Sequence, residues 1–392
     1  MNSKLNLDTI TINSKPTIIA TSVISASASA IFLIMPLLIG VATEELNLSS
    51  ERAGFIASSY FAGYLLICLS AVFWIQRLNW RTISVFGHAL LVIGILAAIA
   101  TSQYNTILAS FFIAGCGGGI LFGLCINILG QTDNPDRSFG IKLSAEQILA
   151  ALLVYLLPLY VIDSWGYTGL GVTLTIVFCV LGFATIWLPS KGNKSEVMSI
   201  NDSKKSTRAV CLGLLALMIF MSGLSGVWAF IERMADENAI SAVDIGKALS
   251  FGLIGGVFGA FAAALFGDRF GRVIPLTLSI LTLSLVLFIL NSNFSLTNFI
   301  FVCIALSGFW NYSLAYQMGI VASIDKTGNL TVLISSALAL GAMLGPAIAG
   351  MLISGDSYLY LHIFAFLCIA SAIGLLIFLS AGAHKGRESS AS

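Results

Sequence analysis

The amino-acid sequence predicts an all-α polytopic membrane protein in which twelve transmembrane helices form two pseudo-symmetric six-helix bundles. Three observations predict it: the composition, the spacing of the apolar runs and the distribution of charge between them. Of the 392 residues, 58% are hydrophobic and 9% are charged, whereas soluble globular proteins carry about 25% charged residues. Apolar surface on this scale needs lipid as its solvent. The composition therefore excludes a soluble enzyme and a disordered protein, and the net charge of +1 offers no attraction to nucleic acid.

Twelve apolar runs, separated by polar clusters, are long enough to cross a bilayer. Lipid satisfies no backbone polar group, so each span must be a helix or a strand of a closed barrel. The lengths of the runs and their lack of strict alternation favour helices. The predicted spans are residues 17–41, 51–75, 82–101, 105–129, 142–162, 166–189, 209–233, 244–267, 273–291, 296–321, 328–353 and 358–381.

The first apolar run is predicted to be a transmembrane helix. Small residues at 26–30 resemble the cleavage site of a signal peptide, which is the alternative. The apolar run continues past them to Val41, however, which is longer than the apolar core of a signal peptide.

The basic residues predict the orientation of the chain. If the N-terminus is cytoplasmic, all of the 19 Lys and Arg residues except Arg52, Arg233 and Lys247 fall on the cytoplasmic side. This bias is the one expected of membrane proteins. We therefore expect both termini in the cytoplasm and, since the chain has one short polar linker and no long tails, location in a bacterial inner membrane.

A weak internal repeat predicts the domain organisation. Residues 190–208, rich in Ser, Lys and Asn, form the longest polar stretch and are expected to be a cytoplasmic linker between bundles at 1–189 and 209–392. The halves correspond at an offset of about 192 residues: Arg77 falls opposite Arg269, and Asp133 opposite Asp325. Such symmetry is typical of transporters built from two six-helix halves.

One loop motif resembles a known family. Between spans 8 and 9 the chain reads Gly-Asp-Arg-Phe-Gly-Arg, residues 267–272, which is similar to the loop signature G-x-x-x-D-R-x-G-R-[RK] of the major facilitator superfamily. The sequence departs from that signature at Ala264 and Val273, and the first-half copy around Arg77 has lost the acid and the glycine. The resemblance implies a conformational latch that holds the halves together in one state; its expected members are Asp268, Arg269, Gly271, Arg272 and Arg77.

The same resemblance implies alternating access between the two bundles, with a central cavity lined by spans 1, 4, 7 and 10. Span 11 carries a glycine-proline pair, Gly345-Pro346, similar to one that drug–proton antiporters of the superfamily carry in helix 5. Span 5 of this chain has no glycine between Leu143 and Ile162. That absence argues against an ordinary drug antiporter.

Polar and aromatic residues within the spans are the candidate substrate site. In span 10, Trp310, Ser313 and Gln317 share one helical face, and they lie deep in the span rather than in an interfacial aromatic belt. Interhelical polar packing is the alternative explanation. The candidate substrate-binding residues are Trp228, Trp310, Asn311, Tyr312, Tyr316, Gln317, Asn127 and Arg233.

Ionisable residues inside a membrane are costly and are by default functional candidates. Glu232 near the outer end of span 7, and Glu146 with its neighbour Gln147 in span 5, are the candidates for proton coupling or gating. The alternatives are an interfacial Glu232 paired with Arg233 and an i, i+4 salt bridge between Lys142 and Glu146 on the cytoplasmic rim.

We therefore expect a secondary active transporter that moves a small organic solute and is coupled to protons. The alternatives are a drug or metabolite efflux antiporter, a facilitative uniporter and a non-transporting protein such as a lipid scramblase or an embedded enzyme. The sequence shows no clustered catalytic residues, no phosphate-binding loop and no metal-ligand spacing among its seven cysteines and three histidines. We expect no catalysis, cofactor or metal, no nucleic-acid partner, and a monomer whose partners are solute, protons and lipid.

Overall fold

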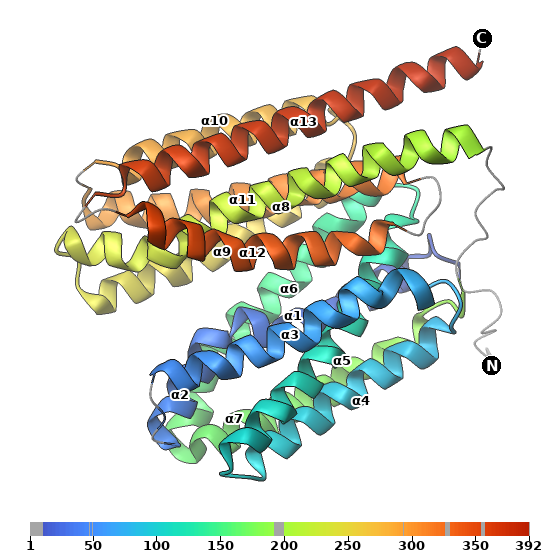
Figure 1. Ribbon diagram of the computed structural model, residues 1–392. Helices are drawn as coiled ribbons and strands as arrows, with labels where there is room; N and C mark the ends of the chain where they lie inside the picture. The colour runs from blue at the N-terminus through green and yellow to red at the C-terminus, as the bar shows by residue number, and fades with distance from the viewer. Residues whose placement is uncertain are drawn as a thin grey trace, which may run out of the picture. The chain divides into compact units, whose positions relative to one another are not determined.

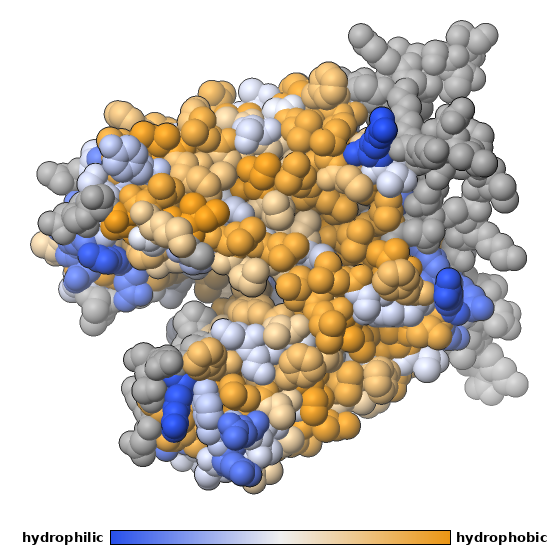
Figure 2. Space-filling model, in the orientation of Figure 1, coloured by the Kyte–Doolittle hydropathy of each residue, from blue (hydrophilic) through white to orange (hydrophobic). Residues whose placement is uncertain are grey.

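The computed structural model describes residues 11–46, 48, 50–191, 200–292, 294–325, 330–353 and 357–391. Within these residues the fold is all-helical, and twelve helices are long and apolar enough to cross a membrane, which confirms the predicted number of spans. Residues 192–199 of the predicted linker lie outside the described part of the chain, as do Lys4, Lys194 and Lys326 from the charge count. Figure 2 shows hydrophobic residues along the visible sides of the helices and hydrophilic residues near their ends, the distribution expected of membrane spans.

Contacts between residues divide the chain into two compact units. Unit 1 comprises Met1–Asp133 and Ile148–Lys194, and unit 2 comprises Asn134–Gln147 and Ser195–Ser392. The short segment Asn134–Gln147 precedes the linker in the sequence but makes its contacts within unit 2. The first half of one helix therefore contributes to the site described below.

In unit 1, helix α5, which is the fourth span, lies at the centre of the packing (Figure 1). The elements are α1 (Lys15–Leu33), α2 (Met35–Glu45), α3 (Ser50–Trp74), α4 (Trp80–Ile99), α5 (Tyr104–Gly130), the second half of α6 (Pro135–Leu157), a π-helical turn (Pro158–Ile162), α7 (Asp163–Gly182) and the 3-10 turn η3 (Phe183–Trp187). Helix α5 packs against α1, α3 and α4, and α4 also packs against α7.

Unit 2 repeats this pattern with the corresponding helices. Its elements are the first half of α6, α8 (Ile200–Glu237), α9 (Ala242–Phe266), α10 (Val273–Leu290), α11 (Leu296–Ile324), a 3-10 turn (Thr331–Leu333), α12 (Ile334–Leu352) and α13 (Leu359–Ala391). Helix α11 packs against α8, α9 and α10 as α5 packs against α1, α3 and α4, and α10 packs against α13 as α4 packs against α7.

The repeat extends to single glycines. A methyl group added at Gly63 on α3 would overlap the carbonyl oxygen of Phe112 on α5, and one added at Gly255 on α9 would overlap that of Ile304 on α11. Gly255 follows Gly63, and Ile304 follows Phe112, at the same offset of about 192 residues that relates the loop charges of the two halves. In each unit a glycine therefore lets two backbones approach closely.

Several helices extend beyond the predicted spans because polar turns continue them outside the apolar run. Helix α6 begins at Pro135 rather than at 142, α8 begins at Ile200 rather than at 209, and α13 ends at Ala391 rather than at 381. The start of α6 has a local cause: the Asn134 side chain accepts a hydrogen bond from the backbone N–H of Arg137 at 3.0 Å, and Pro135 and Asp136 occupy the first turn. Each residue type favours a helix N-terminus.

The first predicted span is two helices. Helix α1 ends at Leu33, and α2 starts at Met35 with a proline in its first turn. Proline has no backbone N–H to donate to the preceding turn, so it favours a new helix start rather than a continuous helix.

Candidate functional site

The loop between α9 and α10 carries the motif of residues 267–272, and two glycines shape it. Gly267 ends α9 with φ 52°, and Gly271 has φ 65°. A side chain is strained at such angles, whereas glycine adopts them readily. The turn places the exposed side chains of Asp268 and Arg269 ahead of Arg272, the residue before α10.

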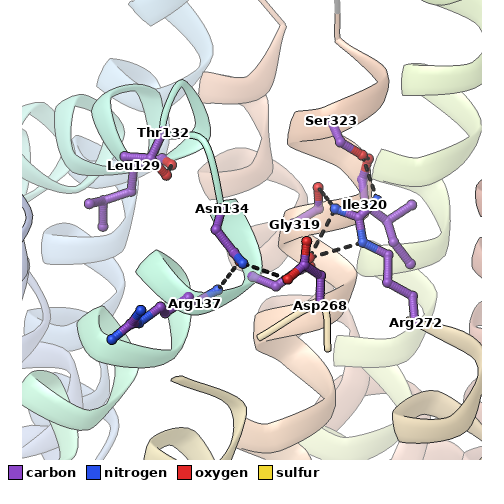
Figure 3. A network of polar contacts seen from close by, with 10 residues as sticks. Leu129, Thr132, Asn134, Arg137, Asp268, Arg272, Gly319, Ile320 and Ser323 are labelled. Atoms are coloured by element: carbon purple, nitrogen blue, oxygen red, sulfur yellow. Dashed lines mark hydrogen bonds and ion pairs between the residues drawn. The ribbon is translucent and has the colours of Figure 1, made fainter. Parts of the chain in front are cut away.

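Arg272 joins this loop to α6 and α11 (Figure 3). Its Nε and Nη2 atoms each lie 3.0 Å from Oδ2 of Asp136. Nη1 donates to Oγ of Ser323 at 2.8 Å, and Nη2 donates to the carbonyl oxygen of Gly319 at 3.3 Å. Asp268 accepts a hydrogen bond from the side-chain amide of Asn134 at 2.8 Å. We call Asn134, Asp136, Asp268, Arg272 and Ser323 the Asp136 cluster.

The Asp136 side chain is only 1% exposed, whereas that of Arg272 is 22% exposed. Gly319 on α11 makes room for the carboxylate, because a methyl group there would overlap Oδ1 of Asp136. The cluster contains two of the predicted latch residues, Asp268 and Arg272. Arg269 and Arg77 are exposed, and Arg77 belongs to unit 1. Sequence reasoning missed Asn134, Asp136 and Ser323, although the Asn-Pro-Asp start of α6 was a signal for the first two.

A second polar group lies further along α6. Nζ of Lys142 is 2.7 Å from Oε1 of Glu146, and these side chains are 0% and 7% exposed. The salt bridge considered in the sequence therefore forms, but it is buried in the protein. Next to it, Nε2 of Gln147 donates to Oδ1 of Asn311 at 3.4 Å, and Nδ2 of Asn311 donates to the carbonyl oxygen of Ser307 at 2.9 Å.

A glycine on helix α9 lies against the side chains of Gln147 and Asn311. A methyl group at Gly256 would lie 3.1 Å from Nδ2 of Asn311 and 3.3 Å from Oε1 of Gln147. The first half of α6, α9 and α11 therefore meet around two amide side chains. We call Lys142, Glu146, Gln147 and Asn311 the α6 polar group.

Aromatic residues of the candidate substrate site form two pairs within unit 2. The Trp228 and Trp310 rings meet edge to face, with centroids 6.4 Å apart and an interplanar angle of 82°. Both indoles are half-buried. The Tyr312 and Tyr316 rings also meet edge to face, at 5.2 Å and 69°, and both are buried.

Gln317 and Ser313 lie on one face of α11, as the i, i+4 spacing predicts, and Nε2 of Gln317 donates to Oγ of Ser313 at 2.8 Å. The Gln317 side chain is fully buried, and its Oε1 has no hydrogen-bond partner among the described residues. A buried amide oxygen without a donor is costly. It is therefore a notable acceptor on this helix.

The remaining candidates lie elsewhere. Glu232 is exposed near the end of α8, and Arg233 pairs with Glu237 rather than with Glu232, Nε to Oε1 at 3.1 Å, in an exposed salt bridge. In unit 1, Oδ1 of the buried Asn127 accepts a hydrogen bond from Nε2 of Gln76 at 3.0 Å. The candidates Glu232, Arg233 and Asn127 therefore lie outside both the Asp136 cluster and the α6 polar group.

Comparison with known proteins relates the chain to one family. The sequence profile of the Major Facilitator Superfamily matches residues 17–209 and 213–392. An uncharacterised MFS-type transporter of Yersinia pseudotuberculosis is 21% identical over 332 residues, covering 81% of this chain and 84% of that protein. A similar transporter of Escherichia fergusonii, YcaD, is 22% identical over 325 residues, with the same two coverages of 81% and 84%.

Solved structures share the fold. FucP, an MFS transporter in the outward conformation, superposes with a TM-score of 0.76 at 16% identity, covering 94% of this chain and 99% of that one. A variant of the same protein, described as the E. coli fucose:proton symporter, gives 0.75 at 14%, covering 93% and 97%. The human organic anion transporter MFSD10 gives 0.70 at 14%, covering 93% and 98%. With twelve membrane-capable helices and a profile match along nearly its whole length, the chain is a multi-pass membrane protein that belongs to the Major Facilitator Superfamily of transporters.

Proposed function

We propose that this protein is a proton-coupled secondary transporter that moves a small organic solute across a bacterial inner membrane by alternating access. The family and the bacterial relatives support transport across such a membrane. Fucose:proton symport by FucP supports proton coupling as one mode that this fold performs. The protein acts as a monomer in this proposal, because one chain contains both units.

The observation that carries the proposal is the α6 polar group. A lysine and a glutamate within a candidate span are both nine-tenths or more buried, and transfer of such charges out of water is costly. A stable helix gains little from this pair that apolar residues would not supply. The presence of so costly a pair supports a functional role, in which the Glu146 carboxylate takes up and releases one proton.

Protonation of Glu146 removes its negative charge and thereby its attraction for the Lys142 ammonium group. Gln147 directly follows Glu146 in the sequence, and its side-chain amide donates a hydrogen bond to Asn311. A change in the charge of Glu146 therefore acts next to the hydrogen bond between α6 and α11. Glu232 is the second candidate for coupling, but its exposed side chain is already accessible to water.

The side chains of unit 2 support a solute with both flat apolar and hydrogen-bonding parts. The half-buried Trp228 and Trp310 rings offer apolar faces and edges. Asn311, Gln147 and the unpartnered oxygen of Gln317 offer amide donors and acceptors. Fucose and organic anions, for which the neighbours FucP and MFSD10 are named, combine such polar groups with an apolar frame.

The Asp136 cluster is proposed to be the conformational latch. Asp136 and Asn134 precede the linker in the sequence, whereas Arg272 and Asp268 follow it, so their bonds tie a first-half helix to a second-half loop. Breaking these bonds frees the start of α6, which is the kind of change that alternating access requires.

The test begins with purified protein and a panel of solutes that includes L-fucose, other hexoses, amino acids and small carboxylates. A solute that binds the folded state raises the thermal unfolding midpoint by mass action. Each solute that does so is then tested in proteoliposomes for counterflow, which needs no driving force, and for accumulation under an imposed pH gradient.

We expect Glu146→Gln to keep counterflow and to lower proton-driven accumulation at least about tenfold, since the amide carries no exchangeable charge. Asp244→Asn is the matched control, because Asp244 forms an exposed helical pair with Lys247 at 3.0 Å. Glu232→Gln tests the second carboxylate. Normal accumulation by Glu146→Gln contradicts the coupling role of that residue, and wild-type counterflow without proton movement indicates a facilitative uniporter. Absence of counterflow for every stabilising solute contradicts transport.

A further inference from the structure

An apolar groove lies between α4 and α7 of unit 1, and its lining shares no residue with the α6 polar group or the Asp136 cluster. Its volume is about 540 Å³, and it continues along η3. Aliphatic and aromatic side chains form most of its lining, among them Val85, Val92, Phe178, Phe183 and Ile186. Val85, Phe183 and Ile186 are at least half exposed, so the groove opens on the outer surface of unit 1, at a place where the exposed side chains are apolar.

One end of the groove is basic. Arg81, in the first turn of α4, lines it, and its Nε donates to the carbonyl oxygen of Leu188. Lys191 is exposed next to Ser190, whose carbonyl oxygen accepts a hydrogen bond from the backbone N–H of Trp80 at 2.9 Å. Residues 75–100 and 170–194 contain no Asp or Glu. This end of the groove therefore presents positive charge, and the parts of α4 and α7 within those two stretches carry no acidic residue to neutralise it.

A histidine lies deeper in the same groove. His88 is 7% exposed and lines the groove; its Nδ1 hydrogen-bonds to the carbonyl oxygen of Ser84 at 2.9 Å. Its Nε2 is buried and has no partner among the described residues. His88 follows Arg81 by seven residues, which is about 10 Å along a helix. A polar atom buried beside an apolar groove is costly unless a ligand or water reaches it.

We propose that this groove binds one anionic phospholipid of the leaflet in which α4 begins. The phosphate lies at Arg81 and Lys191, because guanidinium and ammonium groups form charge-assisted hydrogen bonds with phosphate oxygens. An acyl chain fills the apolar part, and the glycerol ester region lies at the depth of His88. A free inorganic anion would satisfy only the basic end and would leave the apolar length of the groove empty.

The test uses the full-length protein in detergent with equal amounts of phosphatidylglycerol and phosphatidylcholine that carry identical acyl chains. Native mass spectrometry measures how much of each lipid the protein retains. We expect phosphatidylglycerol to be retained at least about fivefold more than phosphatidylcholine, since each basic residue near a membrane surface contributes an attraction of that order. Millimolar inorganic phosphate is expected to leave this retention unchanged.

Two pairs of variants locate the lipid. Ala89→Trp fills the groove from a half-buried lining position and is expected to abolish retention, whereas Ile93→Trp, on an exposed part of α4 outside the lining, is expected to keep it. Arg81→Gln is expected to lower the preference for phosphatidylglycerol about fivefold. Arg52→Gln removes the same charge at the start of α3, the end of that helix that is far from Arg81, and is expected to keep the preference.

Equal retention of both lipids by the wild type overturns the proposal, as does full retention by Ala89→Trp or displacement of the lipid by inorganic phosphate. If Ala89→Trp does not fold, as judged by circular dichroism and gel filtration, the comparison of Arg81→Gln with Arg52→Gln decides. Equal lipid preference in those two variants overturns the proposal.

Discussion

Asp136 and Arg272 are unequal partners in their ion pair. The Asp136 carboxylate is almost completely buried and occupies the space that a methyl group at Gly319 would need, whereas Arg272 is partly exposed and also donates a hydrogen bond to Ser323. Loss of the arginine leaves a buried charge without its counter-ion, which costs about 3–5 kcal/mol in proteins. Loss of the aspartate charge leaves an arginine that water and Ser323 still solvate. Replacing Arg272 and replacing Asp136 are therefore expected to change the stability of the protein by different amounts.

We predict that Arg272→Gln lowers the thermal unfolding midpoint more than Asp136→Asn. The double variant is expected to be more stable than Arg272→Gln alone, because it no longer contains an unpaired buried carboxylate. The measurement is a thermal unfolding series on the four proteins in the same detergent. Arg269→Gln, which changes an exposed arginine of the same loop, is the control and is expected to match the wild type. Strictly additive losses would contradict the direct pairing.

At the scale of the helix, close crossings depend on glycines at equivalent places in the two units. Gly63 lets α3 approach α5, and Gly255 lets α9 approach α11. Association of helices in a membrane relies on van der Waals packing rather than on the hydrophobic effect, so small residues at the crossing points matter more than they do in water.

We predict that Gly63→Ala and Gly255→Ala each destabilise the protein by about 1–3 kcal/mol, since a methyl group at either position overlaps a backbone oxygen and forces the helices apart. Gly246→Ala is the matched control on α9, because, apart from the neighbouring backbone of α9 itself, no atom lies within 4 Å of the added methyl group. Reversible unfolding in denaturing detergent measures the three differences. If Gly255→Ala and Gly246→Ala are equally stable, the crossing does not depend on the glycine.

At the scale of the whole molecule, the basic residues are expected to set the orientation of the twelve spans. Lys and Arg near the ends of spans favour the cytoplasmic side during insertion. An even number of spans then brings both ends of the chain to that side. The prediction of cytoplasmic termini thus depends jointly on the number of spans, which the structure confirms, and on the charge bias.

We predict that green fluorescent protein fused after Ser392 fluoresces in a bacterial host, because it folds in the cytoplasm. A matched fusion after Ile353, which lacks α13, is expected to be dark, since its reporter lies on the opposite side of the membrane. Alkaline phosphatase fused at the same two positions should give the reverse pattern. Fluorescence from both green fusions would contradict the predicted orientation.

Different parts of the site were accessible to sequence reasoning to different degrees. The motif of residues 267–272 indicated where a charged turn lies, and the helical spacing of Ser313 and Gln317 predicted a shared face that their hydrogen bond confirms. Asp136 was missed because its partner lies 136 residues away in the chain, and nothing local to either residue identifies the other. The roles proposed for Glu146, Glu232 and the tryptophans stay predictions.

The number of spans, their helical nature and the internal repeat follow from the order of the residues alone. The bilayer imposes a fixed thickness and forbids unpaired backbone groups, so these features depend on local composition and length. Which side chains meet depends instead on how helices pack. Whether Lys142 and Glu146 are buried, which carboxylate holds Arg272 and where a groove opens are consequences of contacts between distant segments, so only the three-dimensional structure decided them.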